Sequence, residues 1–131
     1  MKFERATFIV VIFVFLILAF GCSTSGESTL TISPNIRFEG NWLYIKNTNH
    51  MSYDAPKIAL NDGQFKLDYP MSIPSREEIR INLSSFLKPD GERFNILKYG
   101  LVDISISCEC SREMGGKWEK LGKAFWYGKF K

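Results

Sequence analysis

The feature that most constrains this chain's fold is the alternation of apolar and polar residues along much of its length. Segments such as Phe65–Tyr69, Ile79–Ile81 and Val102–Cys110 place an apolar side chain at every second position. Successive side chains of a strand point to opposite faces, so this period of two is typical of half-buried β-strands. Outside the N-terminal segment no stretch sustains a helical period. The pattern therefore predicts an all-β domain.

Turn signals divide the alternating segments. Gly40-Asn41 fits a two-residue hairpin turn, Asn61–Gly63 and Gly115-Gly116 also predict turns, and Lys88–Gly91 places Pro and Gly as a type I turn requires. Residues 82–87 lack alternation and predict a short helical turn. About seven or eight short strands, some 8–12 residues apart, favour an antiparallel β-sandwich. The first candidate strand is Thr29–Ile32.

Length and composition indicate one folded domain with balanced charge. The chain has 131 residues and a formal net charge of +3, which argues against a nucleic-acid partner. Aromatic residues make up 15% of the sequence, more than a disordered chain carries.

The N-terminal segment is apolar but short. Lys2 and Arg5 precede an apolar run from Ala6 to Phe20. At about 1.5 Å per residue, a helix of that length spans about 23 Å, which is less than a hydrocarbon core of about 30 Å. This length favours a removable signal helix over a permanent membrane span.

The run ends in Leu18-Ala19-Phe20-Gly21-Cys22, which resembles the lipobox of a bacterial lipoprotein signal peptide. The resemblance implies cleavage between Gly21 and Cys22 and a diacylglycerol thioether on Cys22. The predicted organisation is a signal peptide over 1–21, a flexible tether over 22–28 and a β-sandwich domain over 29–131. The alternatives are a plain secretory signal, or an uncleaved anchor with Cys22 incidental.

The lipobox resemblance also implies a location. The protein is expected in the cell envelope, held to a membrane by its acyl chains. Ser23 follows the cysteine where an inner-membrane lipoprotein of a Gram-negative cell carries Asp. In such a cell the resemblance implies sorting to the outer membrane.

A second resemblance covers residues 36 to 130 and is carried by short motifs. They are Leu43-x-Ile45-x-Asn47, Tyr53, Leu60-Asn61, Ile73-Pro74, Leu83-x-x-Phe86, Asp90-Gly91-Glu92-Arg93-Phe94-Asn95 and Phe125–Phe130. Together they are similar to a group of uncharacterised bacterial proteins with a small immunoglobulin-like sandwich. The chain departs from the group at Ser75-Arg76-Glu77. This resemblance implies a fold and no chemistry.

Cys108-Glu109-Cys110 is the sharpest candidate for chemistry. In a strand both thiols point the same way, with Cα atoms about 6.5–7 Å apart, near the upper limit for a disulfide. They continue the apolar face of Ile104 and Ile106, which favours two small buried thiols. The alternatives are a disulfide, or a redox or soft-metal role, although His50 and the methionines lack ligand spacing.

The C-terminal segment combines basic and aromatic residues. The candidate binding surface comprises Lys117, Trp118, Lys120, Lys123, Trp126 and Lys129. Such a surface suits a partner protein of the envelope, an anionic glycan or a phosphate head group. The alternative is a final hairpin whose aromatics fill the core while its lysines face solvent.

The remaining candidates are weak. Asp90, Glu92 and Asn95 offer too few oxygens for calcium, and no catalytic or cofactor motif is present in the sequence. We therefore predict no catalytic residues, no metal and no cofactor. The expected function is a lipid-anchored binding or scaffolding module, and the alternative is an envelope redox or metal-handling protein using Cys108 and Cys110.

Overall fold

A computed structural model describes residues 30–130 of the chain. The predicted signal peptide, the cleavage site at Gly21 and Cys22, and the tether lie outside these residues.

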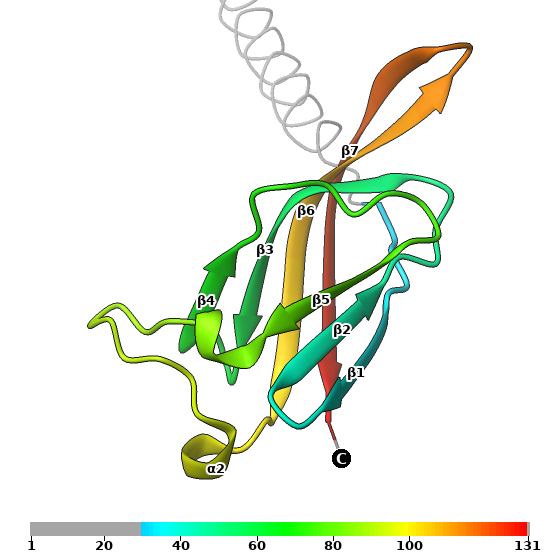
Figure 1. The fold of residues 1–131 in the computed structure, drawn as a ribbon. Coiled ribbons are helices and arrows are strands. Elements are labelled where there is room, and N and C mark those ends of the chain that lie inside the picture. Colours follow the sequence, from blue (N-terminus) through cyan, green and yellow to red (C-terminus); the bar gives the residue numbers. More distant parts are fainter. Residues whose placement is uncertain (1–29, 131) are drawn as a thin grey trace, which may run out of the picture.

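Residues 30–130 form two antiparallel sheets, which confirms the all-β prediction (Figure 1). The three-stranded sheet has the order β1-β2-β5, with β1 Asn35–Glu39, β2 Trp42–Lys46 and β5 Glu78–Asn82. The four-stranded sheet has the order β4-β3-β6-β7, with β4 Phe65–Asp68, β3 Ser52–Leu60, β6 Asp103–Met114 and β7 Lys117–Lys129. The short helical segments are η1 Leu83–Ser85 and α2 Ile96–Tyr99.

One hydrophobic core unites the two sheets. Leu43, Ile45 and Ile81 of the smaller sheet belong to the same buried cluster as Ile58 and Ile106 of the larger sheet. Each strand contributes alternate residues, as the period of two predicts. Val102 is an exception, because it precedes β6 and is 55% exposed, so the inward face of that strand begins at Ile104.

Several local predictions are confirmed. Gly40, with φ of 57°, turns β1 into β2, where Glu39 pairs with Trp42. The predicted helical turn is η1, and the Asn82 side chain caps it by accepting a hydrogen bond from the Ser84 amide.

Other elements differ from the sequence expectation. The strand β3 begins at Ser52, and a bulge between Asp54 and Lys57 carries it past Pro56, which cannot donate a ladder hydrogen bond. Leu30 forms a single bridge with Ala124 instead of belonging to a strand over 29–32. The helix α2 has too few residues to show a helical period in the sequence.

The β6–β7 hairpin extends beyond the body of the larger sheet (Figure 1). Gly115 and Gly116 make its turn with positive φ angles, as their sequence predicts. A register shift between Cys110 and Ser111 marks the root of the projecting part, opposite Gly122 with φ of 142°. Within residues 30–130, no helix has the length and apolar character needed to cross a membrane.

Candidate functional site

The candidate site lies on the outer face of the four-stranded sheet, at the root of the hairpin. Three residues from adjacent segments point into the core there: Tyr53, Ile73 and Cys110. Their chain neighbours must therefore point to the opposite face, because side chains alternate along extended segments. The neighbours are short and polar, and they bring together Ser52, Asp54, Ser72 and Ser111.

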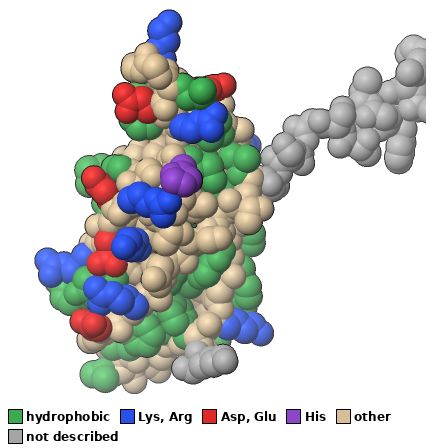
Figure 2. All heavy atoms as spheres, turned by 90° about the vertical axis from the view of Figure 1, so that its right-hand side faces the viewer, with side chains coloured by type: hydrophobic (Ala, Val, Ile, Leu, Met, Phe, Trp, Pro, Cys, Tyr) green, Lys and Arg blue, Asp and Glu red, His purple; other side chains and the backbone are tan. Residues whose placement is uncertain are grey.

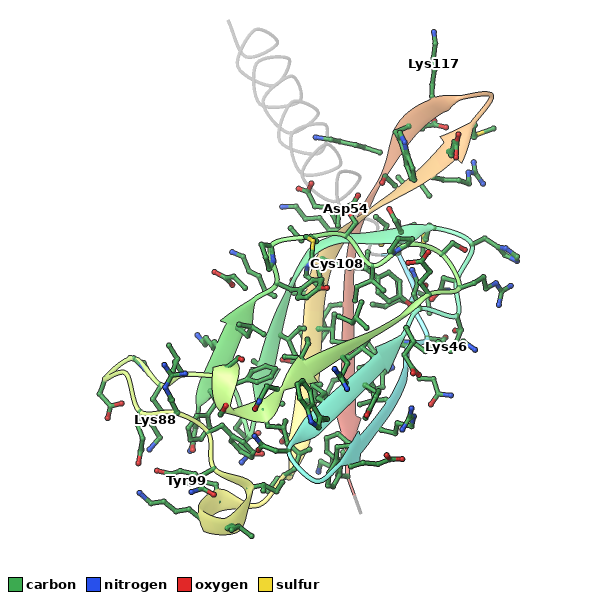
Figure 3. All side chains as sticks on the ribbon, viewed as in Figure 1. Lys46, Asp54, Lys88, Tyr99, Cys108 and Lys117 are labelled. Carbon is green, nitrogen blue, oxygen red and sulfur yellow. The ribbon has the colours of Figure 1, made fainter. Side chains whose placement is uncertain are left out.

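These four residues form the floor of a cleft of about 200 Å³, and Pro74 and Trp118 complete its lining. We call it the hairpin-root cleft. Figure 3 shows Asp54 at the root of the hairpin, with Lys117 pointing away from the body at its far end. Residues that lie more than 50 positions apart in the sequence thus meet at one site.

A hydrogen-bonded hydroxyl cluster organises the floor. The Oγ atoms of Ser52 and Ser111 lie 2.8 Å apart, and the Ser52 hydroxyl also lies 2.7 Å from Asp54 Oδ1. The Ser72 hydroxyl donates to the same Oδ1 at 3.0 Å. Ser52 and Ser111 are only 4% and 8% exposed. The floor is therefore preorganised, and among the described residues Asp54 Oδ2 receives no hydrogen bond.

Trp118 is the predicted site residue that the structure brings to this cleft. It lies on β7 with 65% of its surface exposed. The predicted lysines Lys117, Lys120, Lys123 and Lys129 are also exposed. They do not form a separate basic patch, since Lys123 pairs with Glu109 in the strand register, and acidic side chains stand among the basic ones (Figure 2).

The prediction that Trp126 belongs to the binding surface is wrong, because its side chain faces the interior. Its neighbour Ala124 is 2% exposed, and the Trp126 ring packs against the core and covers Gly128. The alternation of β7 instead turns Phe125 and Tyr127 outward, with 58% and 46% exposure. Trp126 thus fits the alternative interpretation of a final hairpin with core-facing aromatics, whereas Phe125 and Tyr127 do not.

Cys108 and Cys110 lie side by side in the core as free thiols, with their sulfur atoms 3.9 Å apart. Their mutual hydrogen bond raises the pKa of Cys108 far above its usual range and lowers the pKa of Cys110, while burial acts to raise both. Cys108 and Cys110 are only 7% and 1% exposed, and such burial limits the access of a reaction partner or a metal ion to either sulfur atom. Within residues 30–130, no three His, Cys, Asp or Glu side chains are grouped as a metal site would require.

The oxygens weighed as calcium ligands have other partners. Asn95 Oδ1 caps α2, and Asp90 Oδ1 accepts from the Glu92 amide. The Glu92 carboxylate accepts from Lys98, Tyr99 and Lys88, which lowers its pKa to about 2. These contacts fix the loop that precedes β6. His50 Nε2 lies 3.1 Å from an Arg76 guanidinium nitrogen on the surface.

Sequence reasoning missed the polar floor of the cleft. Its one local signal is the spacing of Ser52 and Asp54, which places both on one face of a strand. The spacing alone does not show that the two residues lie in a strand, because the nearby Pro56 cannot donate a ladder hydrogen bond. Ser72 and Ser111 become partners only through the sheet register.

Comparison with known proteins adds no relative to this description. No family model, curated protein or solved structure matches the chain.

Proposed function

We propose that this chain is a lipid-anchored binding module of a bacterial cell envelope. Its binding surface comprises the hairpin-root cleft and the outward aromatic residues of β7. The observation that carries the proposal is the exposure of Trp118, Phe125 and Tyr127 on one face of one strand. Large aromatic side chains exposed together beside a polar cleft are typical of a recognition surface.

The anchor is proposed from the lipobox-like sequence that ends at Cys22. Two or three acyl chains would hold the domain durably, since each buried methylene contributes about 0.8 kcal/mol. In a Gram-negative cell we propose the outer membrane as the location, because Ser23 stands where inner-membrane lipoproteins carry Asp.

We further propose that the fold is of the immunoglobulin-like class. Lettered A to G along the chain, the strands give the neighbour orders A-B-E and C-F-G, which are those of immunoglobulin constant domains. The fourth strand lies beside the third instead of beside the fifth. Because one fold hosts many functions, the binding role is argued from the exposed aromatic residues and the cleft and not from the fold.

The alternative function, redox or metal handling by Cys108 and Cys110, has less support. Both thiols are buried in the core, where a reaction partner or a metal ion has little access to them.

Metabolic labelling with palmitate in a bacterial host tests the anchor. The full chain should incorporate label, Cys22→Ser should abolish incorporation, and the matched variant Cys108→Ser should retain it. The mass of the N-terminal peptide should correspond to a chain that starts at a lipidated Cys22. An unlabelled chain, or a retained leader, would contradict the proposal.

Cosedimentation tests the binding surface. Detergent-solubilised full chain should sediment with insoluble bacterial cell-wall material. The triple variant Trp118→Ala, Phe125→Ser, Tyr127→Ser should stay in the supernatant while keeping its thermal unfolding transition. Equal sedimentation of both proteins, or of neither, would contradict the proposed surface.

A further inference from the structure

We infer that the hairpin-root cleft binds a neutral pyranose unit of a glycan, with the rest of the glycan lying along β7. This inference rests on the proposed binding function and names its ligand class. It is argued from the hydrogen-bonding groups, the charge and the aromatic surface of the site.

The floor of the cleft matches a ligand with many hydroxyl groups. Ser52 and Ser111 are almost fully buried and hydrogen-bonded to each other. The groups that can reach a ligand are therefore the exposed Ser72 hydroxyl, which donates and accepts, and the Asp54 carboxylate, which accepts only. The hydroxyls of Ser52 and Ser72 both engage Oδ1, which leaves Oδ2 as an acceptor for a ligand hydroxyl. A sugar supplies adjacent groups that donate and accept at once.

The charges around the cleft favour a neutral ligand. An anion would meet the Asp54 carboxylate at the floor, and desolvating that pair of like charges is unfavourable. The projecting hairpin carries both signs of charge, with Lys117, Lys120 and Arg112 beside Glu113 and Glu119, so it does not select a charged ligand. A neutral polyol avoids the repulsion at Asp54 and needs no charged partner.

The aromatic wall of the cleft matches the apolar face of a sugar ring. Trp118 presents an exposed indole next to the polar floor, with Pro74 also lining the cleft. A pyranose has a face of C–H groups that packs on an aromatic ring while its hydroxyls point sideways. Indole rings provide large rigid contact area at low entropic cost, so such stacking is favourable.

The same face of β7 continues the site beyond one sugar unit. Phe125 and Tyr127 lie two residues apart, which places them about 6.5–7 Å from each other along the strand. Their register partners on β6 are Ser107 and Ser105, which add further hydroxyl groups. Phe125 and Tyr127, beside Ser107 and Ser105, form an open platform that is separated from Trp118 by Lys120 and Lys123. A surface of this length suits a linear glycan better than a free monosaccharide.

Binding of the full chain to an array of neutral and anionic oligosaccharides tests this inference. The detergent must contain no sugar headgroup, and choline serves as a cationic probe. We expect a neutral oligosaccharide to bind, with an affinity that calorimetry then measures. Trp118→Ala should weaken it at least about tenfold, as loss of a central aromatic contact does.

Matched variants separate the cleft from general effects. Trp42→Ala removes a tryptophan on the other sheet, where it contacts Arg80, and should leave the affinity unchanged. Asp54→Asn should weaken binding severalfold, whereas Asp68→Asn on β4 should not. Binding only of anionic oligosaccharides or of choline, or neutral binding that Trp118→Ala leaves intact, would overturn the inference.

Failure of the inference can be told apart from failure of the proposed function. If cell-wall sedimentation depends on Trp118 but excess neutral oligosaccharide does not compete, the glycan inference is wrong and the binding surface stands. If sedimentation is absent, the proposed function itself is wrong.

Discussion

At the scale of single residues, buried polar side chains fix how the segments around the core meet. Asn47 is fully buried, and its Nδ2 donates to the carbonyl oxygens of Met51 and Ile73 at 2.8 and 2.9 Å. Its Oδ1 accepts from the Asn49 amide. Asn47 therefore ties the end of β2 to Met51, just before β3, and to Ile73, between β4 and β5. The spacing Leu43-x-Ile45-x-Asn47 puts all three side chains on one face of a strand, but it cannot reveal the partners of Asn47.

Replacing Asn47 with Asp should destabilise the fold strongly. The variant keeps the shape but presents an oxygen to two buried carbonyl oxygens, and unsatisfied buried groups cost about 1–3 kcal/mol or more. Asn95→Asp is the matched control, because Asn95 only accepts a hydrogen bond at the start of α2, which Asp also does. Urea denaturation should show the loss for Asn47→Asp alone. Equal stabilities of the two variants would refute this role.

Glu92 should make stability depend on pH in the acid range. The folded pKa of its carboxyl group is lowered to about 2 from 4.5, by hydrogen bonds from Lys98, Tyr99 and Lys88. A lowered pKa means that this stabilisation is complete above about pH 4.5 and is lost as the pH falls towards 2. Urea midpoints at pH 6 and pH 3 should therefore differ less in Glu92→Gln than in the wild type. The exposed variant Glu113→Gln should keep the wild-type difference.

At the scale of elements, the β6–β7 hairpin supplies an edge strand of the four-stranded sheet and part of the candidate site. Its alternation was readable from sequence, as was the turn at Gly115-Gly116. The register shift beside Ser111 was not readable, because a bulge depends on the partner strand and leaves no period of its own. That shift decides which aromatics face outward. Trp118 is therefore exposed, whereas Trp126 packs against the core and its neighbours Phe125 and Tyr127 face outward.

The inward packing of Trp126 on Gly128 gives a direct test of the strand's orientation. A Cβ atom on Gly128 would lie 2.4 Å from the Trp126 ring, so Gly128→Ala should cost about 1–3 kcal/mol of unfolding free energy. In a Trp126→Leu background the same change should cost clearly less. A double-mutant cycle measures this coupling. Additive effects of the two substitutions would place Trp126 away from Gly128.

At the scale of the whole molecule, composition and periodicity were sufficient to predict one all-β domain with two layers. They could not predict the cleft, because its floor is assembled from β3, β6 and the segment around Ser72, which sequence distance conceals. Long-range pairing, rather than local propensity, therefore creates the candidate site.

Counting reactive thiols tests both the lipidation of Cys22 and the burial of Cys108 and Cys110. The chain has three cysteines. After reduction, the folded lipidated protein should react slowly with a thiol reagent, because Cys108 and Cys110 are buried. In denaturant two thiols should react, since a thioether blocks Cys22. Rapid reaction of both thiols in the folded protein would contradict their burial, and a third thiol would contradict lipidation.

The pairing of Leu30 with β7 limits how far the folded domain could lie from an anchor at Cys22. Leu30 donates to the Lys123 carbonyl oxygen and lies beside Gly122. The eight residue steps from Cys22 to Leu30 can span at most about 28 Å. If Cys22 is acylated, this short distance would keep the hairpin-root cleft close to the bilayer surface. Such a module would bind glycan polymer that lies against its own membrane and would not reach polymer farther away.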